Sequence, residues 1–276
     1  EVSRQTIEID IRHPLLPVTN TFAHILEPGE KLTTGLQLHG MPGTHSAVIE
    51  VSRTPPLNLG QRLNELVQYP HGCAEQTTSK AFPQVYLSRL MTLPAGKDQA
   101  VRDNVQAAVN KLKGFQKTDG GFSYWQGQNQ VNDWTTSYVG HFLLEAQNAG
   151  FPVPDEILSK WTTYQSNVAQ GWVPKNSNRR HNRSQLMQAY RLYTLALAGS
   201  PSLSSMNRLK EHGQLNEMAQ WRLAAAYQLA GQHRVATEMV KGLSQTVDVY
   251  RELSNTFGSS LRDMAMILET LVLLDK

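Results

Sequence analysis

Three predicted helices in the second half of the chain end in the same way, at an Ala-Gly pair. These pairs are Ala149-Gly150, Ala198-Gly199 and Ala230-Gly231, and a further helical pattern begins within a few residues of each. Glycine adopts a positive φ without strain and therefore commonly terminates a helix. Helices that turn back so soon lie antiparallel, which predicts stacked α/α hairpins. Because the three glycines are unevenly spaced, an irregular α/α toroid is favoured over a solenoid of fixed period.

Helical periodicity continues through almost all of the chain after Pro55-Pro56. Pro83 lies inside one of the predicted helices and should kink it, because proline lacks the backbone N–H that a helix interior needs. The sequence therefore predicts a mainly α domain. Its predicted helices cover residues 58–68, 74–91, 98–115, 133–148, 155–169, 183–198, 203–211, 214–230, 233–243 and 259–275.

The first 55 residues have a different pattern, in which short apolar and β-branched runs are separated by turn residues. Residues 6–11 and 46–51 are predicted strands of a short antiparallel β segment. So few strands cannot bury a face by themselves, and the remaining partners are expected outside this chain. The predicted division is a β segment over 1–56 and a helical domain over 57–276. The final apolar run has no helix stop signal, so this domain is expected to be truncated at its C-terminus.

Composition excludes several classes of protein. The 26 basic and 23 acidic residues give a net charge of only +3, which does not favour a nucleic-acid partner. No apolar run approaches the ~20 residues that cross a bilayer, and the first residues do not resemble a signal peptide, so the chain is expected to be soluble. A single cysteine excludes an internal disulfide and a cysteine-rich zinc site. No cofactor or metal is expected.

The lone cysteine stands in Gly72-Cys73-Ala74-Glu75-Gln76. Residues three apart at a helix start share a face, so the Cys73 sulfur can meet the Gln76 carboxamide. Attack of the thiolate on that amide, with loss of ammonia, would give an internal thioester. Gly72 would allow a close backbone approach before the helix. Glu75 has two interpretations that stay open: it interacts with the N-terminal amides of the helix, or it assists proton transfer.

The structural alternative is that Cys73 is an ordinary buried cysteine, which is the usual role of a lone one. The neighbouring residues argue against it, because Gly, Glu and Gln at these offsets occur by chance in on the order of one in several thousand cases at average composition.

The segment Tyr69-Pro70-His71-Gly72-Cys73-Ala74-Glu75-Gln76-Thr77-Thr78-Ser79 resembles the thioester motif of bacterial alpha-2-macroglobulins, and complement-type thioester proteins share its Gly-Cys-x-Glu-Gln core. The resemblance extends over most of the chain. It implies that residues 57–276 are a thioester domain and that residues 1–56 belong to a CUB-like β domain. It also implies that Tyr69 shields the bond together with a residue from a neighbouring domain. In some relatives a distant histidine transfers the acyl group. His181 is the candidate by rough position, the alternative being a solvated loop histidine.

The resemblance implies a function in which the chain is not an enzyme but part of a broad-spectrum endopeptidase inhibitor. A protease cleaves a bait segment elsewhere in the parent protein, and the exposed thioester then acylates a lysine of the attacker in a single turnover. The implied partners are target proteases and the other domains of the parent chain, which is expected to be monomeric. The implied location is the bacterial periplasm, with the parent anchored to the inner membrane as a lipoprotein.

Two other classes of protein are alternatives to a thioester protein. An α/α-toroid enzyme would need paired acids or a His/Cys/Asp zinc set at the mouth of the ring, and the sequence offers neither. A helical interaction module, in which the motif is inert, would retain the hairpins without the chemistry. Amine labelling at Gln76 distinguishes these classes from a thioester protein.

Overall fold

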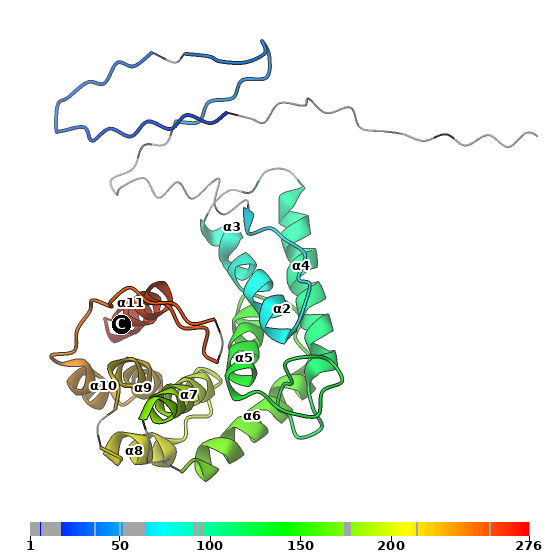
Figure 1. The fold of residues 1–276 in the computed structure, drawn as a ribbon, viewed down its shortest axis with the longest axis vertical. Helices are drawn as coiled ribbons and strands as arrows, with labels where there is room; N and C mark the ends of the chain where they lie inside the picture. Colours follow the sequence, from blue (N-terminus) through cyan, green and yellow to red (C-terminus); the bar gives the residue numbers. More distant parts are fainter. Residues whose placement is uncertain are drawn as a thin grey trace, which may run out of the picture. The chain divides into compact units, whose positions relative to one another are not determined.

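The computed structural model describes residues 6, 18–35, 37–49, 51, 65–90, 93, 96–173, 178–213, 215–253 and 255–275, with the backbone alone for 178–183 (Figure 1). The chain divides into two compact units, Glu1–Leu59 and Gly60–Lys276.

The described residues of the first unit contain no strand. The strand predicted for 46–51 is therefore not formed at residues 46–49 and 51, and the one predicted for 6–11 lies outside the described residues apart from Thr6. The side chains of Val48 and Ile49 are 93% and 86% exposed. A strand needs a neighbour to pair with its backbone groups and a face to bury, and this segment has neither within its described residues.

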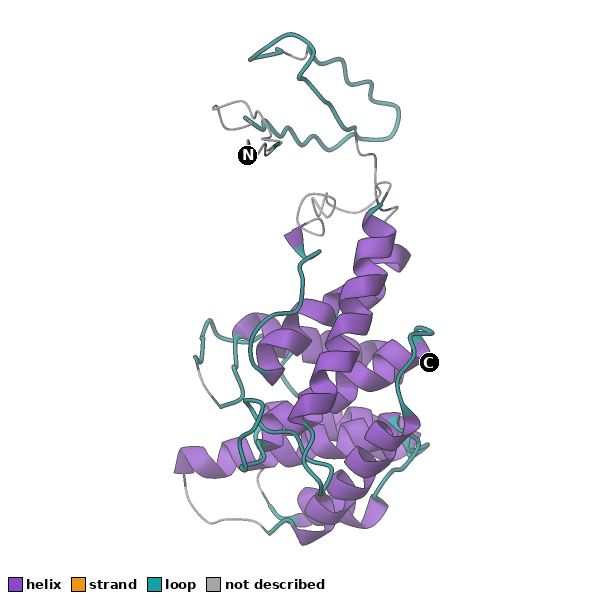
Figure 2. Ribbon diagram, turned by 90° about the vertical axis from the view of Figure 1, so that its right-hand side faces the viewer, coloured by secondary structure: helices purple, strands orange, loops and turns teal. Residues whose placement is uncertain are grey.

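The second unit is built from helices, which the sequence predicts well except at some boundaries (Figure 2). Most of the helix predicted for 58–68 lies outside the described residues. The helices are α2 (Ala74–Ala81), α3 (Leu87–Leu90), α4 (Lys97–Leu112), α5 (Asp133–Asn148), α6 (Asp155–Gly171), α7 (Asn178–Leu197), α8 (Leu203–Glu211), α9 (Glu217–Leu229), α10 (His233–Val240) and α11 (Ser260–Leu274), with 3-10 turns η1 (Pro83–Tyr86) and η2 (Lys113–Phe115). Within the described residues, no helix combines the length and the hydropathy of a membrane-spanning segment.

The kink predicted at Pro83 is confirmed. Helix α2 ends at Ala81, the chain passes through the 3-10 turn η1, and helix α3 then begins at Leu87. Proline at the first position of η1 has no N–H to donate, so the α-helical ladder cannot continue through it.

The helices form two rows. Helices α2, α5, α7, α9 and α11 contact one another in chain order, while α4, α6, α8 and α10 each contact two neighbours in that inner row (Figure 1). Apart from the short helix α3, consecutive helices therefore alternate between an inner and an outer position. This alternation is consistent with the predicted α/α toroid.

The Ala-Gly helix ends behave as predicted. Gly150, Gly199 and Gly231 have φ values of 88°, 70° and 74°, in the left-handed region. The residue after each glycine donates its backbone N–H to the carbonyl five residues earlier, at distances of 3.0, 2.9 and 2.8 Å. These bonds satisfy carbonyls that the helix end would otherwise leave unpaired, and they stop each helix where its hairpin turns.

The core has two parts, one formed mainly by α2, α4, α5 and α6 and the other mainly by α7 to α11. Trp161 of α6 has no exposed surface, and its Nε1 donates to the Thr136 carbonyl of α5 at 2.8 Å. Its ring lies against Gly140, where a Cβ atom would come within 2.0 Å of the indole. The absence of a side chain at Gly140 therefore sets how closely α5 and α6 approach.

Candidate functional site

Cys73 is the N-cap residue of α2, and its backbone is extended, with φ of −68° and ψ of 176°. The Gln76 backbone N–H donates to the Cys73 sulfur at 3.5 Å, and the Cys73 backbone N–H donates to Gln76 Oε1 at 3.3 Å. This reciprocal pair of bonds is a capping box, with the sulfur in the place that a serine or threonine oxygen usually takes. The side chains of Cys73 and Gln76 are thereby held together at the N-terminus of the helix.

Gly72 has a φ of +99°, which L-residues with a side chain rarely adopt. A Cβ atom at this position would lie 2.0 Å from Gln76 Oε1 and 3.0 Å from Gln76 Cδ. The Gln76 carboxamide therefore folds back over the space that the glycine leaves empty. Only glycine combines this backbone conformation with room for the carboxamide.

The segment that leads into Cys73 is fixed by contacts with neighbouring helices. Lys111 of α4 donates from Nζ to the Pro70 carbonyl at 3.2 Å. Thr77, one turn into α2, has no exposed surface, and its hydroxyl donates to the Gly72 carbonyl at 3.4 Å. These bonds hold the residues before the helix against the helix itself, so the motif is part of the packed domain.

The cysteine and the glutamine differ in exposure. Cys73 is only 1% exposed, while Gln76 lies at the surface. The sulfur therefore lies below the surface, and the side chain of Gln76 is accessible to solvent and to other molecules. An acyl group on the side chain of residue 76 could therefore be reached from solvent, while the Cys73 sulfur bound to it would lie below the surface.

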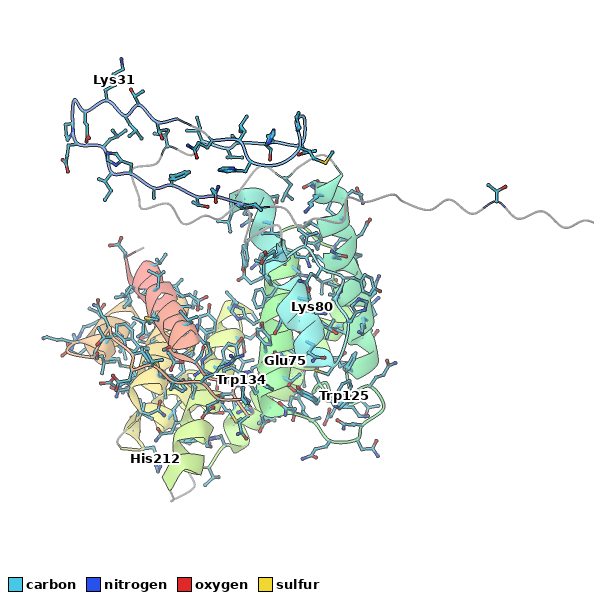
Figure 3. The ribbon with its side chains drawn as sticks, turned by 45° about the horizontal axis from the view of Figure 1, so that its top comes forward. Lys31, Glu75, Lys80, Trp125, Trp134 and His212 are labelled. Carbon is cyan, nitrogen blue, oxygen red and sulfur yellow. The ribbon has the colours of Figure 1, made fainter. Side chains whose placement is uncertain are left out.

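The loop before α5 also contacts the motif, and Trp125 is labelled on it in Figure 3. The Tyr124 carbonyl of this loop accepts the backbone N–H of Ala74 at 3.0 Å. Burial raises the pKa of the Tyr124 hydroxyl, and the neighbouring Cys73 side chain raises it further. The sequence prediction missed this residue. The Asp119–Trp125 segment resembles a turn that plugs one end of a helical ring, and no local pattern indicates a contact across about fifty residues.

Glu75 lies in the first turn of α2, where a carboxylate interacts favourably with the helix dipole. Its Oε1 atom accepts a hydrogen bond from the Ser79 hydroxyl at 2.7 Å, and that hydroxyl lies 3.3 Å from the Tyr138 hydroxyl. The carboxylate is thus paired along the face of α2 with Ser79. A role in proton transfer stays a prediction.

The two remaining predicted site residues have different outcomes. Tyr69 is 54% exposed, and its ring centroid lies 4.7 Å from that of His71. Its position before the motif leaves it open to contact from another domain, and its shielding role stays a prediction. The backbone of His181 lies in α7, so this residue is in a helix and not in a loop. Its side chain lies outside the described residues. Within the described part of the chain, no group of three or more His, Cys, Asp or Glu residues could hold a metal ion.

The two rows of helices and the cap define the class of this domain: a mainly helical domain of α/α hairpins with Gly-Cys-x-Glu-Gln at the start of an inner helix. The A-macroglobulin TED domain family matches residues 50–188, which is half of the chain. The chain belongs to this family.

The chain is similar to bacterial alpha-2-macroglobulins. That of Escherichia coli is 26% identical over 283 residues, covering 96% of this chain and 17% of that protein. That of Xylella fastidiosa is 27% identical over 238 residues, covering 83% of this chain and 14% of that protein. The chain therefore spans about a sixth of the length of these relatives.

The fold is similar to that of solved alpha-2-macroglobulins. The crystal structure of the Salmonella protein reacted with methylamine matches with a TM-score of 0.67 and 28% identity, over 79% of this chain and 15% of that one. The native E. coli protein from domain MG7 to its C-terminus matches with a TM-score of 0.66 and 25% identity, over 80% of this chain and 38% of that one.

Proposed function

We propose that Cys73 and Gln76 form an internal thioester. The sulfur attacks the carboxamide carbon of Gln76, a C–S bond forms, the C–N bond breaks, and the nitrogen leaves as ammonia. The product is an acyl group that is far more electrophilic than the original amide. It is consumed once, when an amine attacks the same carbon and the sulfur departs as a thiolate.

One observation carries this proposal: the capping box that joins the two residues. Its bonds of 3.3 and 3.5 Å tie the Gln76 carboxamide oxygen to the Cys73 backbone and the Cys73 sulfur to the Gln76 backbone. The reacting groups are thus held on one side of the helix start before any chemistry occurs, which lowers the entropic cost of their meeting.

The biological role proposed for this acyl group is covalent capture of attacking proteases through lysine amines. The chain would then be a thioester domain over 57–276, preceded over 1–56 by part of a CUB-like domain, in a monomeric, broad-spectrum endopeptidase inhibitor. Membership of the A-macroglobulin TED domain family supports this role. By the same resemblance, the parent protein would be periplasmic and anchored to the inner membrane as a lipoprotein.

A thioester has to be covered until it is needed, because water or small amines would otherwise consume it. Tyr69 is 54% exposed in this chain, which fits a residue that completes its cover only with another domain. We therefore expect the thioester of the isolated chain to be labile and to decay to a free Cys73 thiol with glutamate at position 76. A stable ammonia-lighter species that resists methylamine would contradict this expectation.

The test is to synthesise the chain in the presence of radiolabelled methylamine, so that the acyl group is captured as it forms. Label is expected at position 76, with one free thiol at Cys73, and neither product is expected in Cys73→Ala. An unmodified glutamine at 76 in every molecule would refute the proposal. That result would favour a helical interaction module with an inert motif. If the chain instead turned over a substrate, and Cys73→Ala did so equally well, an α/α-toroid enzyme would be favoured.

A further inference from the structure

The peptide unit between Gly72 and Cys73 is hydrogen bonded at both of its ends. Its carbonyl oxygen, which belongs to Gly72, accepts from the Thr77 hydroxyl at 3.4 Å. Its N–H, which belongs to Cys73, donates to Gln76 Oε1 at 3.3 Å. Because a trans peptide is planar, with its C=O and N–H pointing in opposite directions, a bond that orients one end also orients the other. The Thr77 hydroxyl therefore helps to aim the Cys73 N–H at the carboxamide oxygen.

Thr77 is itself held in place. Its side chain is buried, with no exposed surface, and its backbone N–H donates to the Cys73 carbonyl at 2.9 Å. A β-branched side chain in a helix has few χ1 rotamers, so the hydroxyl has little freedom to turn away. Thr77 is therefore a fixed donor to the Gly72 carbonyl, in contrast to a hydroxyl on the surface that water could satisfy equally well.

The neighbouring backbone donors at the start of α2 have other acceptors. The N–H of Ala74 donates to the Tyr124 carbonyl at 3.0 Å, which ties the helix start to the loop before α5. The N–H of Gln76 donates to the Cys73 sulfur at 3.5 Å. The Cys73 N–H is thus the donor at the carboxamide oxygen, and the Gln76 N–H is the donor at the sulfur.

The two atoms that these N–H groups contact are the two that become negative in the proposed reaction. When a nucleophile attacks the acyl carbon of residue 76, the electron pair of the C=O bond moves onto the oxygen. When the C–S bond breaks, its electron pair moves onto the sulfur. An N–H group that is already in place stabilises such charge without reorganisation, and the N-terminus of α2 also favours negative charge.

We infer that the Cys73 backbone N–H stabilises the oxyanion at residue 76 when the thioester forms and when it opens, and that Thr77 is the positioning residue for this donor. The inference rests on the proposed thioester. In formation, the sulfur bonds to the carboxamide carbon, the oxyanion collapses, and the nitrogen takes the thiol proton and leaves as ammonia. In opening, an amine nitrogen bonds to the same carbon, the oxyanion collapses, and the sulfur leaves as a thiolate. The proton lost by the amine goes to solvent.

Thr77→Val tests the positioning role, because valine has nearly the shape of threonine but no hydroxyl. If Thr77 only filled space beside the motif, the variant would open the thioester at the unaltered rate or faster. If Thr77 aims the donor, both formation and opening should be about tenfold slower, which is less than the loss expected when an oxyanion donor is removed outright. Thr77→Ser should come within about twofold of the unaltered rates, since serine carries the same donor.

The experiment follows residue 76 by mass spectrometry after synthesis of the full chain. The appearance of the ammonia-lighter species and its products measures formation, and the loss of that species in methylamine measures opening. Thr194→Val is the matched control, because Thr194 also has no exposed surface and its hydroxyl donates within α7, to the Arg191 carbonyl at 3.0 Å. The control should keep the unaltered rates. Opening of Thr77→Val at an unchanged or higher rate, or a Thr77→Ser variant as slow as Thr77→Val, would overturn the inference.

A second variant removes the donor itself and keeps the test sharp if Thr77→Val folds poorly. Replacement of Cys73 by its α-hydroxy analogue retains every side chain but puts an ester oxygen in place of the N–H. Formation and opening are then expected to be about 10²-fold slower. Rates equal to those of the unaltered chain would overturn the inference while leaving the proposed thioester intact. If the unaltered chain yields neither glutamate nor methylamide at position 76, the proposed function fails and this inference fails with it.

Discussion

Gly72→Ala tests whether the empty space at position 72 is what places Gln76 beside Cys73. The added Cβ atom would lie 2.0 Å from Gln76 Oε1 and 3.0 Å from Gln76 Cβ, so the carboxamide has to swing away. The backbone at residue 72 has a φ of +99°, which also disfavours alanine. The substitution thus combines a backbone strain with a displacement of one reacting group.

The structure gives the size of the two contributions to the stability that Gly72→Ala loses. Alanine in the left-handed region costs about 1–2 kcal/mol. Loss of the bond from the Cys73 N–H to Gln76 Oε1 removes half of the capping box and costs about 1 kcal/mol more. The free energy of unfolding should therefore fall by about 2–3 kcal/mol in total, while the helices remain.

Gly150→Ala separates the backbone strain from the displacement of the carboxamide. Gly150 has a φ of 88°, and a Cβ atom there would meet nothing within 4 Å. This variant introduces the backbone strain alone. Its free energy of unfolding should therefore fall by about 1–2 kcal/mol, without effect on the motif. Denaturant unfolding measures the stability of both variants.

The assay is the yield of methylamide plus glutamate at position 76 after synthesis with methylamine. Gly150→Ala is expected to match the unaltered chain, and Gly72→Ala to yield at most about a tenth as much, because an ångström-scale displacement of a reacting group costs about 10²-fold in rate. If the yield of Gly72→Ala equals that of Gly150→Ala, the position of the carboxamide in this structure does not matter for the reaction, and the reasoning is refuted.

Three further predictions test the cap, the helix packing and the response to pH. Cys73→Ser should retain or slightly increase stability in denaturant unfolding, because serine is a preferred N-cap, yet it should incorporate no methylamine. Gly140→Ala places a Cβ atom 2.0 Å from the Trp161 indole and should lower the free energy of unfolding by about 1–3 kcal/mol, whereas an unchanged value would refute the close packing of α5 and α6. Burial lowers the pKa of His141 to about 4, so the folded state loses stability as the pH falls from about 6.5 towards 4, by up to about 3 kcal/mol. His141→Phe should remove that part of the pH dependence in unfolding experiments between pH 7 and pH 4, and an identical slope would contradict the assignment.

The sequence was sufficient to predict the features that depend on local chemistry. Glycine at a helix end has a direct physical meaning, so Gly150, Gly199 and Gly231 located three hairpins. Pro83 indicated the break after α2 for the same kind of reason. The three-residue spacing of Cys73 and Gln76 also implies that they meet, because that distance is fixed by the geometry of a helix start.

Features that depend on the packing of distant segments could not be predicted. The Tyr124 carbonyl meets the Ala74 N–H only because the loop before α5 folds against the start of α2, and no periodicity in the sequence indicates that contact. The enclosure of His141 by aromatic rings is of the same kind, since Phe82 comes from the end of α2 and Tyr190 and Tyr193 come from α7. The β-branched pattern at 46–51 predicted a strand, but strand formation depends on partners, and none is present in the described part of that segment.

The most direct test of the thioester is the tandem mass spectrum of the peptide that contains residues 70 to 80 from freshly synthesised chain. The proposed chemistry predicts a precursor lighter by one ammonia, whose fragments place the loss on a link between Cys73 and residue 76. That species should disappear on treatment with methylamine and should be absent from Cys73→Ala. A peptide of full mass, with Cys73 alkylated in every molecule and an unmodified Gln76, would contradict it.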